Sequence, residues 1–263
     1  MELHAMDLYI KSLIKEAGHR IRNSFSTDLV IETKSDANDL VTNMDKEVEK
    51  FFIERIRQDF PGHRVFGEEG FGDVIKDLNG VVWLLDPIDG TMNFVHQKSN
   101  FAISLGVYED GIGKLGYIYD VMNDRLYHAT KGQGAYCNDE KLAPLSETSV
   151  ATSIIGINAT WAAPNKYIDH EKIIRLLREV RGTRSYGSAA LELAYVASGK
   201  IDAYVSMRLS PWDIAGGMVI AQEVGAIATN FIGEAANLLV QDTFVAANPS
   251  IHKTLLADYI HLK

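Results

Sequence analysis

Residues 81–94 of this chain read Val-Val-Trp-Leu-Leu-Asp-Pro-Ile-Asp-Gly-Thr-Met-Asn-Phe, and this stretch decides the fold. Its five apolar residues predict a strand buried on both faces, and Pro87, which has no N–H to donate to a sheet, predicts the end of that strand. Ligands of open α/β sheets collect at the carboxyl ends of strands. Asp86, Asp89 and the Ile88 carbonyl could therefore turn toward one point and hold Mg²⁺, which prefers oxygen ligands.

The same residues also suit a tight turn in which Asp and Thr side chains bond the local backbone, so the stretch alone leaves both interpretations open. Two further residues favour a binding site. Gly90 lets a phosphate approach the backbone, and free amides at a helix start favour an anion. Thr91 carries a hydroxyl that can orient an attacking water and take its proton.

Composition excludes several classes of protein. The 263 residues, 46% of them hydrophobic, suffice for one large domain or two smaller ones that share a core, and 35 acidic against 26 basic residues argue against a nucleic-acid-binding surface. The single cysteine, Cys137, excludes an internal disulfide and is compatible with a reducing cytoplasm. Residues 1–24 have a helical period, and no stretch approaches the roughly 18 apolar residues of a membrane span. We expect a cytoplasmic protein without direct nucleic-acid or membrane binding.

The pattern along the chain predicts an α+β half followed by an α/β half. The first half contains a polar loop at residues 32–39, a helix at 44–59 capped by Thr42 or Asn43, and an antiparallel meander at 102–108, 115–121 and 126–129. A change in composition around 142–153 predicts the boundary, with halves at 1–143 and 144–263. Strands are expected in the second half at 154–158, 201–206, 226–230 and 243–247, and helices at 170–180, 189–198 and 213–224.

Other acidic residues are ambiguous when each is considered alone. Glu68 and Glu69 follow a short strand and have the character of a solvated loop pair. Asp213 precedes an apolar helix, where capping is the default role of a carboxylate. Residues 111–116 match a dinucleotide fingerprint, but they lie between two expected strands with no helix after them, so we interpret them as a hairpin turn.

Five motifs stand in order along nearly the whole chain. They are Asp39-Leu40-Val41-Thr42-Asn43-Met44-Asp45, Gly67-Glu68-Glu69, residues 83–94, Gly187-Ser188-Ala189-Ala190, and Pro211-Trp212-Asp213-Ile214-Ala215-Gly216 with Glu223-Val224-Gly225 after it. Together they resemble the inositol monophosphatase family of Mg²⁺-dependent, commonly lithium-sensitive phosphatases, which are relatives of fructose-1,6-bisphosphatase. The resemblance implies that Glu68 and Asp213 are metal ligands.

The resemblance also implies the mechanism. Glu68, Asp86 and the Ile88 carbonyl would hold a first Mg²⁺, and Asp86, Asp89 and Asp213 a second, with a third, weaker ion near Glu68. A water at the first ion, oriented by Thr91 with Asp45 behind it, would attack phosphorus in line while the Gly90 and Thr91 amides hold phosphate oxygens. Two ions that clamp the attacking and leaving oxygens need no covalent intermediate.

The fold implied by the resemblance is an αβαβα sandwich, of mixed α+β and α/β class, with the site between the two halves and usually with a homodimeric assembly. The implied substrate-binding residues are Asp89, Gly90, Thr91, Gly187, Ser188, Ala189, Ser206 and Arg208. Lys34 falls in the loop that closes over the third metal in relatives, although a solvated lysine is an equal interpretation.

Substrate choice is open at Ser206. Animal inositol monophosphatases have there a glutamate that binds a ring hydroxyl, and here Arg208 follows close behind the serine. Serine beside arginine could admit a larger or doubly phosphorylated substrate, with Arg184 as a further candidate, while the alternative for Arg208 is a plain surface charge. Inositol 1-phosphate is the default small-molecule substrate. The rivals are fructose 1,6-bisphosphate, the 2′-phosphate of NADP and 3′-phosphoadenosine 5′-phosphate, and a regulatory role through protein partners in transcription complexes is an alternative of another class.

Overall fold

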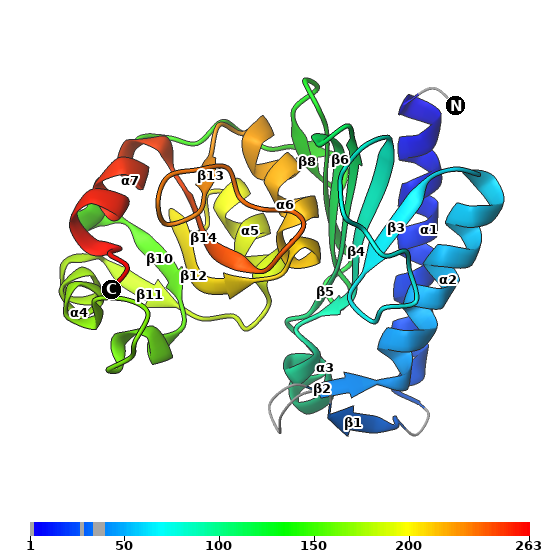
Figure 1. Cartoon of the computed structure of the whole chain (residues 1–263), viewed down its shortest axis with the longest axis horizontal. Coiled ribbons are helices and arrows are strands. Elements are labelled where there is room, and N and C mark those ends of the chain that lie inside the picture. The colour runs from blue at the N-terminus through cyan, green and yellow to red at the C-terminus, as the bar shows by residue number, and fades with distance from the viewer. Residues whose placement is uncertain (1–2, 27–28, 34–39) are drawn as a thin grey trace.

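The computed structural model describes residues 3–26, 29–33 and 40–263. The α-helices are α1 (Leu3–Ser24), α2 (Asn43–Asp59), α3 (Thr91–Gln97), α4 (His170–Glu179), α5 (Ala189–Ala197), α6 (Pro211–Glu223) and α7 (Pro249–Thr254), and shorter helical turns are η1 (Val150–Thr152), η2 (Ala159–Ala162) and η3 (Leu255–Tyr259). Helices and sheets alternate in five layers (Figure 1). The layers are α1 with α2, a seven-stranded sheet, α5 with α6, a five-stranded sheet, and α4 with α7. This order confirms the αβαβα sandwich.

In the seven-stranded sheet the strands lie side by side in the order of the chain, β3-β4-β5-β6-β7-β8-β9. Its strands are β3 (Arg64–Gly67), β4 (Val81–Asp89), β5 (Ala102–Glu109), β6 (Ile112–Asp120), β7 (Arg125–Thr130), β8 (Ala135–Cys137) and β9 (Glu140–Lys141). β3 is parallel to β4, and every later pair is antiparallel, which confirms the predicted meander. The parallel pair brings the carboxyl ends of β3 and β4, and so their acidic residues, to the same edge.

The five-stranded sheet has the order β11-β10-β12-β14-β13. Its strands are β10 (Ile154–Ile157), β11 (Gly182–Arg184), β12 (Ala203–Leu209), β13 (Ile227–Thr229) and β14 (Asp242–Ala247). β10 is parallel to β11 and β12, whereas β14 runs antiparallel to β12 and β13. The sequence predicted the other four strands and missed β11, which is short and polar and follows α4 after a brief turn.

Three apolar cores hold the layers together. One lies between α1, α2 and the first sheet, one surrounds α5 and α6 between the two sheets, and one lies between the second sheet and the outer helices. The middle helix α6 approaches the first sheet very closely: a Cβ on Gly216 would lie 2.6 Å from the Tyr117 carbonyl oxygen. Glycine is therefore required for this contact. The close packing fixes the start of α6, and hence Asp213, beside the first sheet.

The structure corrects the expected extent of one loop and one turn. Residues 32–39 are not entirely loop, because β1 (Ile31–Thr33) pairs antiparallel with β2 (Leu40–Thr42). All three residues of β1 are exposed, so no apolar alternation marks the strand in the sequence. Residues 34–39, with Lys34 among them, lie outside the described part of the chain. The hairpin expected at residues 111–116 is present between β5 and β6, but its turn is only Asp110-Gly111, and Ile112 to Gly116 already belong to β6.

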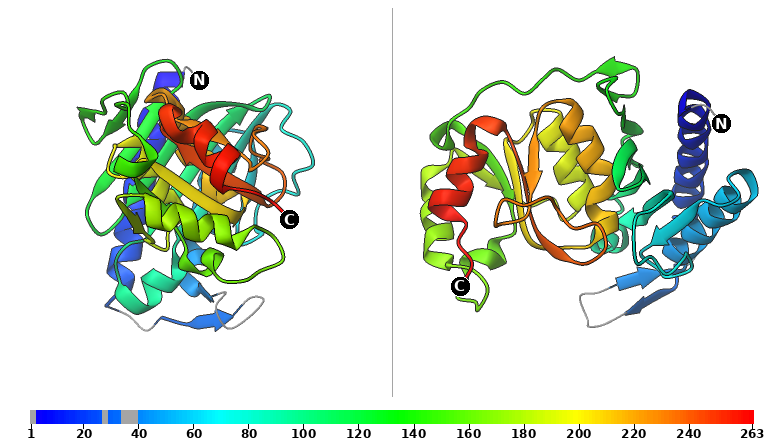
Figure 2. Two further views of the ribbon diagram at one scale, coloured as in Figure 1. Left: turned by 90° about the vertical axis from the view of Figure 1, so that its left-hand side faces the viewer. Right: turned by 45° about the horizontal axis from the view of Figure 1, so that its top comes forward.

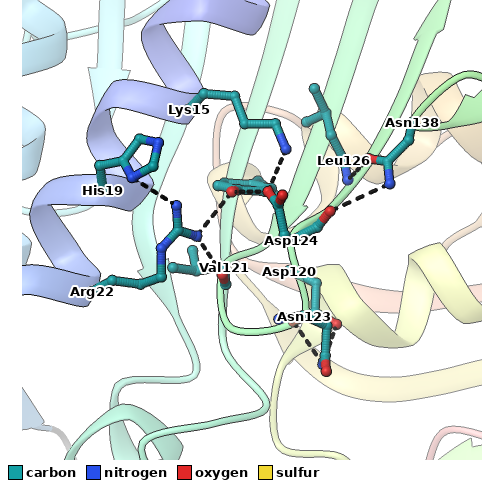
Figure 3. A network of polar contacts seen from close by, with 10 residues as sticks. Lys15, His19, Arg22, Asp120, Val121, Asn123, Asp124, Leu126 and Asn138 are labelled. Atoms are coloured by element: carbon teal, nitrogen blue, oxygen red, sulfur yellow. Dashed lines mark hydrogen bonds and ion pairs between the residues drawn. The ribbon is translucent and has the colours of Figure 1, made fainter.

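Polar contacts tie α1 to the turn between β6 and β7 (Figure 3). The Arg22 guanidinium donates to the Val121 carbonyl oxygen at 2.6 Å and to the Tyr119 hydroxyl at 2.9 Å, and Lys15 forms an ion pair with Asp124. The chain then leaves β9 and crosses toward the second sheet above the central helices (Figure 2, right). In this crossing the Leu145 amide donates to the Val224 carbonyl oxygen at 3.0 Å, at the end of α6. Among the described helices, none has the length and apolar character needed to span a membrane.

Candidate active site

Three carboxylates meet at the edge of the first sheet. Asp86 and Asp89 come from β4 and Asp213 from the first turn of α6, and one oxygen of each lies within 4.8 Å of the others. Asp86 and Asp89 are buried, and Asp213 is half-buried. The Ser210 amide donates to Asp213 at 2.8 Å in a reciprocal cap, so this residue caps α6 and also faces the cluster. The capping role considered for Asp213 in the sequence is present, and its role as a metal ligand stays a prediction.

Pro87 bends β4 instead of ending it. The strand continues to Asp89, but the pairing with β5 shifts between Asp86 and Asp89, which is a bulge. The missing N–H of a proline is tolerated at a bulge, so the prediction that the strand stops at this residue is wrong. Ile88 has no register partner across this bulge, and its carbonyl oxygen accepts from the Thr91 hydroxyl at 3.1 Å. It thus faces the same edge as the carboxylates.

Glu68 lies in the turn after β3, beside Asp86. A residue that the sequence reasoning missed holds this turn: Glu49 of α2 is fully buried, and its carboxylate accepts from the Glu69 amide at 2.7 Å and the Phe71 amide at 2.8 Å. A Cβ on Gly67 would overlap the Glu49 carboxylate. The glycine before Glu68 was the signal that something approaches closely there.

Thr91 and Asp45, which were predicted to orient the attacking water, are joined by a hydrogen bond. The Thr91 hydroxyl lies 3.1 Å from Asp45 Oδ1, while Asp45 Oδ2 accepts from the Thr42 amide at 2.8 Å and the Thr42 hydroxyl at 2.6 Å. Thr42 is the cap of α2, as predicted. Asp45 is almost fully buried. Burial raises the pKa of Asp45, with the Glu68 charge adding to this, although the Thr42 bonds oppose the shift.

The second half of the chain holds Asp89 from the opposite side. Its Oδ2 accepts from the Ser188 hydroxyl and, at 2.7 Å, from the Ala190 amide at the start of α5. Gly90 packs against this loop, since a Cβ on Gly90 would lie 3.1 Å from the Gly187 carbonyl oxygen. The segments predicted to bind substrate in the two halves therefore touch.

A cavity of about 270 Å³ opens beside these groups. Its lining includes seven of the predicted site residues, namely Asp89, Gly187, Ser188, Ala189, Ser206, Arg208 and Asp213, and also Trp161 and Glu192. Glu68, Asp86, Thr91 and Asp45 lie outside the lining, on the side of the first sheet. Arg184, the further candidate, is exposed on β11, and its side chain bonds the neighbouring Thr183 carbonyl oxygen at 2.8 Å.

The carboxylates repel one another in the absence of a cation. Burial and the nearby charges of Glu68, Asp89 and Asp213 raise the pKa of Asp86 well above its usual range. The pKa of Asp89 is also raised, mainly by burial, against the bonds from Ser188 and Ala190. A hard cation that accepts oxygen ligands would relieve both effects, so the chemistry of these donors fits Mg²⁺.

The sequence did not predict roles for Asn93 and Glu192. Both bond the backbone of Tyr186, in the loop that leads to Ser188. The Asn93 amide donates to the Tyr186 carbonyl oxygen at 2.7 Å, and the Tyr186 amide donates to Glu192 Oε1 at 2.8 Å. The other oxygen of the buried Glu192 has no hydrogen-bond partner among the described residues. Burial, with a contribution from Asp89, raises the pKa of Glu192 to about 7.

We expect Glu49→Leu to weaken Mg²⁺-dependent activity by roughly 10- to 100-fold, the usual effect of removing a group that orients a metal ligand. The loss should arise because the turn that carries Glu68 no longer has its two amide bonds to Glu49. Glu49→Gln, which keeps one acceptor oxygen, should lose less. Activity measured across a Mg²⁺ titration would show a shifted half-saturation point; an unchanged one would contradict this role.

Glu192 should make stability depend on pH. Its pKa is about 4.5 in the unfolded chain and about 7 in the folded protein, so the folded state binds the extra proton. Protonation of Glu192 therefore contributes stability that is fully present below pH 4.5 and falls as pH rises toward 7, by on the order of 2 to 3 kcal/mol. Unfolding of wild type and Glu192→Gln in EDTA, compared across this window, should give a flatter profile for the variant. Parallel profiles would contradict the shift.

Comparison with known proteins also indicates a phosphatase. Residues 2–262 match the inositol monophosphatase family. The inositol-1-monophosphatase of Bacillus subtilis (strain 168) is 58% identical over 258 residues, which cover 98% of this chain and 97% of that protein. A structure of SaIMPase-II with bound 2'AMP has a TM-score of 0.89 at 43% identity, covering 97% of this chain and 94% of that one. A structure of an IMPase/NADP phosphatase complexed with Mg²⁺ and phosphate has a TM-score of 0.90 at 30% identity, covering 97% and 95%. This chain belongs to the inositol monophosphatase family.

Proposed function

We propose that this chain is a Mg²⁺-dependent hydrolase of small-molecule phosphate monoesters, with inositol 1-phosphate as its default substrate. The observation that carries the proposal is the cluster of Asp86, Asp89 and Asp213 beside the pair formed by Thr91 and Asp45. The relatives named above act on or bind small phosphates. Fructose 1,6-bisphosphate, 3′-phosphoadenosine 5′-phosphate and the 2′-phosphate of NADP are the rival substrates.

The carboxylates would hold the ions. Glu68, Asp86 and the Ile88 carbonyl suit one Mg²⁺, and Asp86, Asp89 and Asp213 suit another, with a third, weaker ion near Glu68. When bound, the ions would activate water as Lewis acids and neutralise charge on the phosphoryl group and the departing oxygen. Li⁺ is expected to inhibit by competing for these oxygens.

The protein's own groups would align the reaction. The Thr91 hydroxyl can accept a proton from the attacking water while it passes its own proton to Asp45 Oδ1, 3.1 Å away. The raised pKa of Asp45 makes this carboxylate a better proton acceptor than an exposed one. Gly90 and Thr91 amides would position the phosphate, and Ser188 would keep Asp89 in place, leaving Gly187, Ala189, Ser206 and Arg208 to contact the leaving alcohol.

A substrate panel tests this proposal. Phosphate release from inositol 1-phosphate and the three rivals would be measured with Mg²⁺ and again with EDTA. Mg²⁺-dependent release from at least one compound, abolished by EDTA, is expected. Release that persists in EDTA would contradict a metal-dependent mechanism.

Ser206→Glu should shift the panel toward inositol 1-phosphate by roughly 10-fold in relative kcat/KM, since a carboxylate that accepts a ring hydroxyl is worth about 1 to 2 kcal/mol. Ser206 is buried and lines the cavity near Asp213, so the longer side chain would reach the leaving group. Ser206→Gln, of the same length without the charge, is the control. If Ser206→Glu ranked the substrates as wild type does, residue 206 would not determine substrate specificity.

The remaining expectations stay predictions. These are the two halves at residues 1–143 and 144–263, the homodimer, the cytoplasmic location, and the absence of direct nucleic-acid or membrane binding. The regulatory role in transcription complexes has no specific structural support in the described residues. It would be supported if Asp86→Asn abolished catalysis but retained binding to a protein partner.

A further inference from the structure

A buried serine joins β5 to the start of α6. Ser104 is fully buried, and its hydroxyl donates to the Trp212 carbonyl oxygen at 3.1 Å. Trp212 immediately precedes Asp213 in the first turn of α6, which lies against the first sheet beside β5 and β6 (Figure 1). The bond therefore connects the strand to the helix at the peptide that leads into a predicted metal ligand.

Ser104 also lies directly across the sheet from Asp86. The register of β4 and β5 pairs these two residues, and the side chains of paired residues stand on the same face of a sheet. One side chain thus connects the two elements that carry Asp86 and Asp213, whose oxygens lie within 4.8 Å of each other.

Glycines set how closely α6 approaches the sheet, but they have no side chains that interlock with the helix. A Cβ on Gly106 would lie 2.9 Å from the Ala215 Cβ, and a Cβ on Gly116 would lie 2.3 Å from the Gly216 carbonyl oxygen. Such a surface leaves the helix free to shift along the strands. A hydrogen bond adds the missing constraint, because its strength falls steeply with angle.

Tyr108 forms a second bond of the same kind, further from the carboxylates. Its ring is buried, and its hydroxyl donates to the Ala215 carbonyl oxygen at 2.9 Å. Tyr108 pairs with Val82 at the start of β4, whereas Ser104 pairs with Asp86 near the end of that strand. The two bonds hold the same helix to the same strand, and they differ in their distance from the predicted metal ligands.

The Asp213 carboxylate moves with the backbone of the first turn of α6. Aspartate has a short side chain, and the Ser210 amide donates to Asp213 Oδ2 at 2.8 Å, so the carboxylate is fixed relative to the helix. Its position relative to Asp86 then depends on how the helix lies on the sheet. Mg²⁺ requires near-ideal octahedral geometry, so a displacement of about 0.5 Å in one ligand weakens its binding.

We propose that Ser104 is a positioning residue for the metal site: its bond to the Trp212 carbonyl sets the separation of the Asp86 and Asp213 carboxylates. This inference rests on the proposed phosphatase function. It assigns the geometry of the site to a residue of β5 that neither holds an ion nor touches substrate in that proposal.

The two proposed ions should respond differently to loss of this bond. The ion held by Asp86, Asp89 and Asp213 takes a ligand from α6, so its affinity depends on Ser104. The ion near Glu68 takes its protein ligands from β4 and the turn after β3, so its affinity should not change. A serine that served only the stability of the fold would not produce this difference.

Binding of Mn²⁺, followed by the electron paramagnetic resonance signal of the free ion, tests the proposal without turnover. Ser104→Ala should weaken one class of site by roughly 10- to 100-fold, the usual effect of removing a group that orients a metal ligand, and leave the other class unchanged. Tyr108→Phe is the matched control, since it removes the β5-to-α6 bond that lies away from the carboxylates, and it should leave both classes unchanged. Asp86→Asn should weaken both classes.

Unfolding in EDTA separates positioning from a loss of stability. Ser104→Ala and Tyr108→Phe should each melt roughly 2 to 4 °C below wild type, because each lacks one buried hydrogen bond. The Trp212 ring packs edge-on against Phe66 with centroids 5.1 Å apart, so the helix should stay docked in both variants. If Ser104→Ala does not fold, Ser104→Cys, with similar size and a weaker donor, should show a smaller loss at the same class of site.

Three results would overturn this role for Ser104. They are Mn²⁺ binding by Ser104→Ala that equals that of wild type, an equal loss at both classes of site, and a loss in Tyr108→Phe as large as that in Ser104→Ala. In each case Mg²⁺-dependent phosphate release by wild type would leave the proposed function intact. A wild type that neither binds Mn²⁺ at sites lost in Asp86→Asn nor cleaves any compound of the panel would contradict the proposed function itself.

Discussion

Asp86→Asn is expected to lower kcat/KM for the best phosphate monoester by at least about 1,000-fold. Asp86 is the carboxylate that both proposed ions share, and metal ions supply several kcal/mol of charge stabilisation to such transition states. At about 1.4 kcal/mol for each factor of ten, the loss of 4 kcal/mol gives this figure. Steady-state phosphate release with saturating Mg²⁺ is the measurement.

The fold should survive this substitution. Asparagine has the same shape, and its Oδ1 can still accept from the Ile88 amide, which donates to Asp86 at 3.0 Å. The raised pKa of Asp86 means that its charge costs stability in the absence of metal, so Asp86→Asn in EDTA should melt no lower than wild type at neutral pH. Mg²⁺ should raise the melting temperature of wild type more than that of the variant. Near-normal turnover in a folded Asp86→Asn protein would rule out the shared-carboxylate arrangement.

Thr91→Val should reduce kcat by roughly 100- to 10,000-fold, the range of a positioned proton-transfer group, with a small effect on KM. Valine keeps the branched shape but removes the hydroxyl that lies 3.1 Å from both Asp45 Oδ1 and the Ile88 carbonyl oxygen. The expected loss arises because the attacking water would have no group to orient it. Single-turnover and steady-state rates with Mg²⁺ would locate the defect in the chemical step.

Thr91→Ser is the matched control, since it keeps the hydroxyl and should recover most of the rate. Asp45→Asn should resemble Thr91→Val, because an amide accepts a proton poorly. A Thr91→Val enzyme within threefold of wild type would show that this hydroxyl does not orient the water.

The sequence predicted most of the residues that the structure brings together at the candidate site, because they stand at the ends of recognisable elements. Asp86 and Asp89 follow an apolar strand, and Asp213 follows Ser210 and Pro211 at a helix start. The tertiary contact that joins these ends, with oxygens within 4.8 Å, comes from the packing of α6 on the first sheet. Periodicity alone cannot provide such a contact.

The groups that hold the site in position were not predictable in the same way. Glu49 and Glu192 lie inside helices, where a glutamate normally faces water, but each is buried and accepts a backbone amide from a loop. The prediction that the strand ends at Pro87 was wrong for a related reason. A bulge in the pairing with β5 allows β4 to continue past Pro87.

The most direct test of the central claim is a crystal structure grown with Mn²⁺ and analysed by anomalous scattering. Strong peaks are predicted on both sides of Asp86, one shared with Glu68 and the Ile88 carbonyl and one shared with Asp89 and Asp213. In Asp86→Asn crystals both peaks should weaken or disappear. An enzyme active with Mn²⁺ whose crystals show no peak beside Asp86, or peaks only elsewhere, would contradict the assignment of these carboxylates as the catalytic metal site.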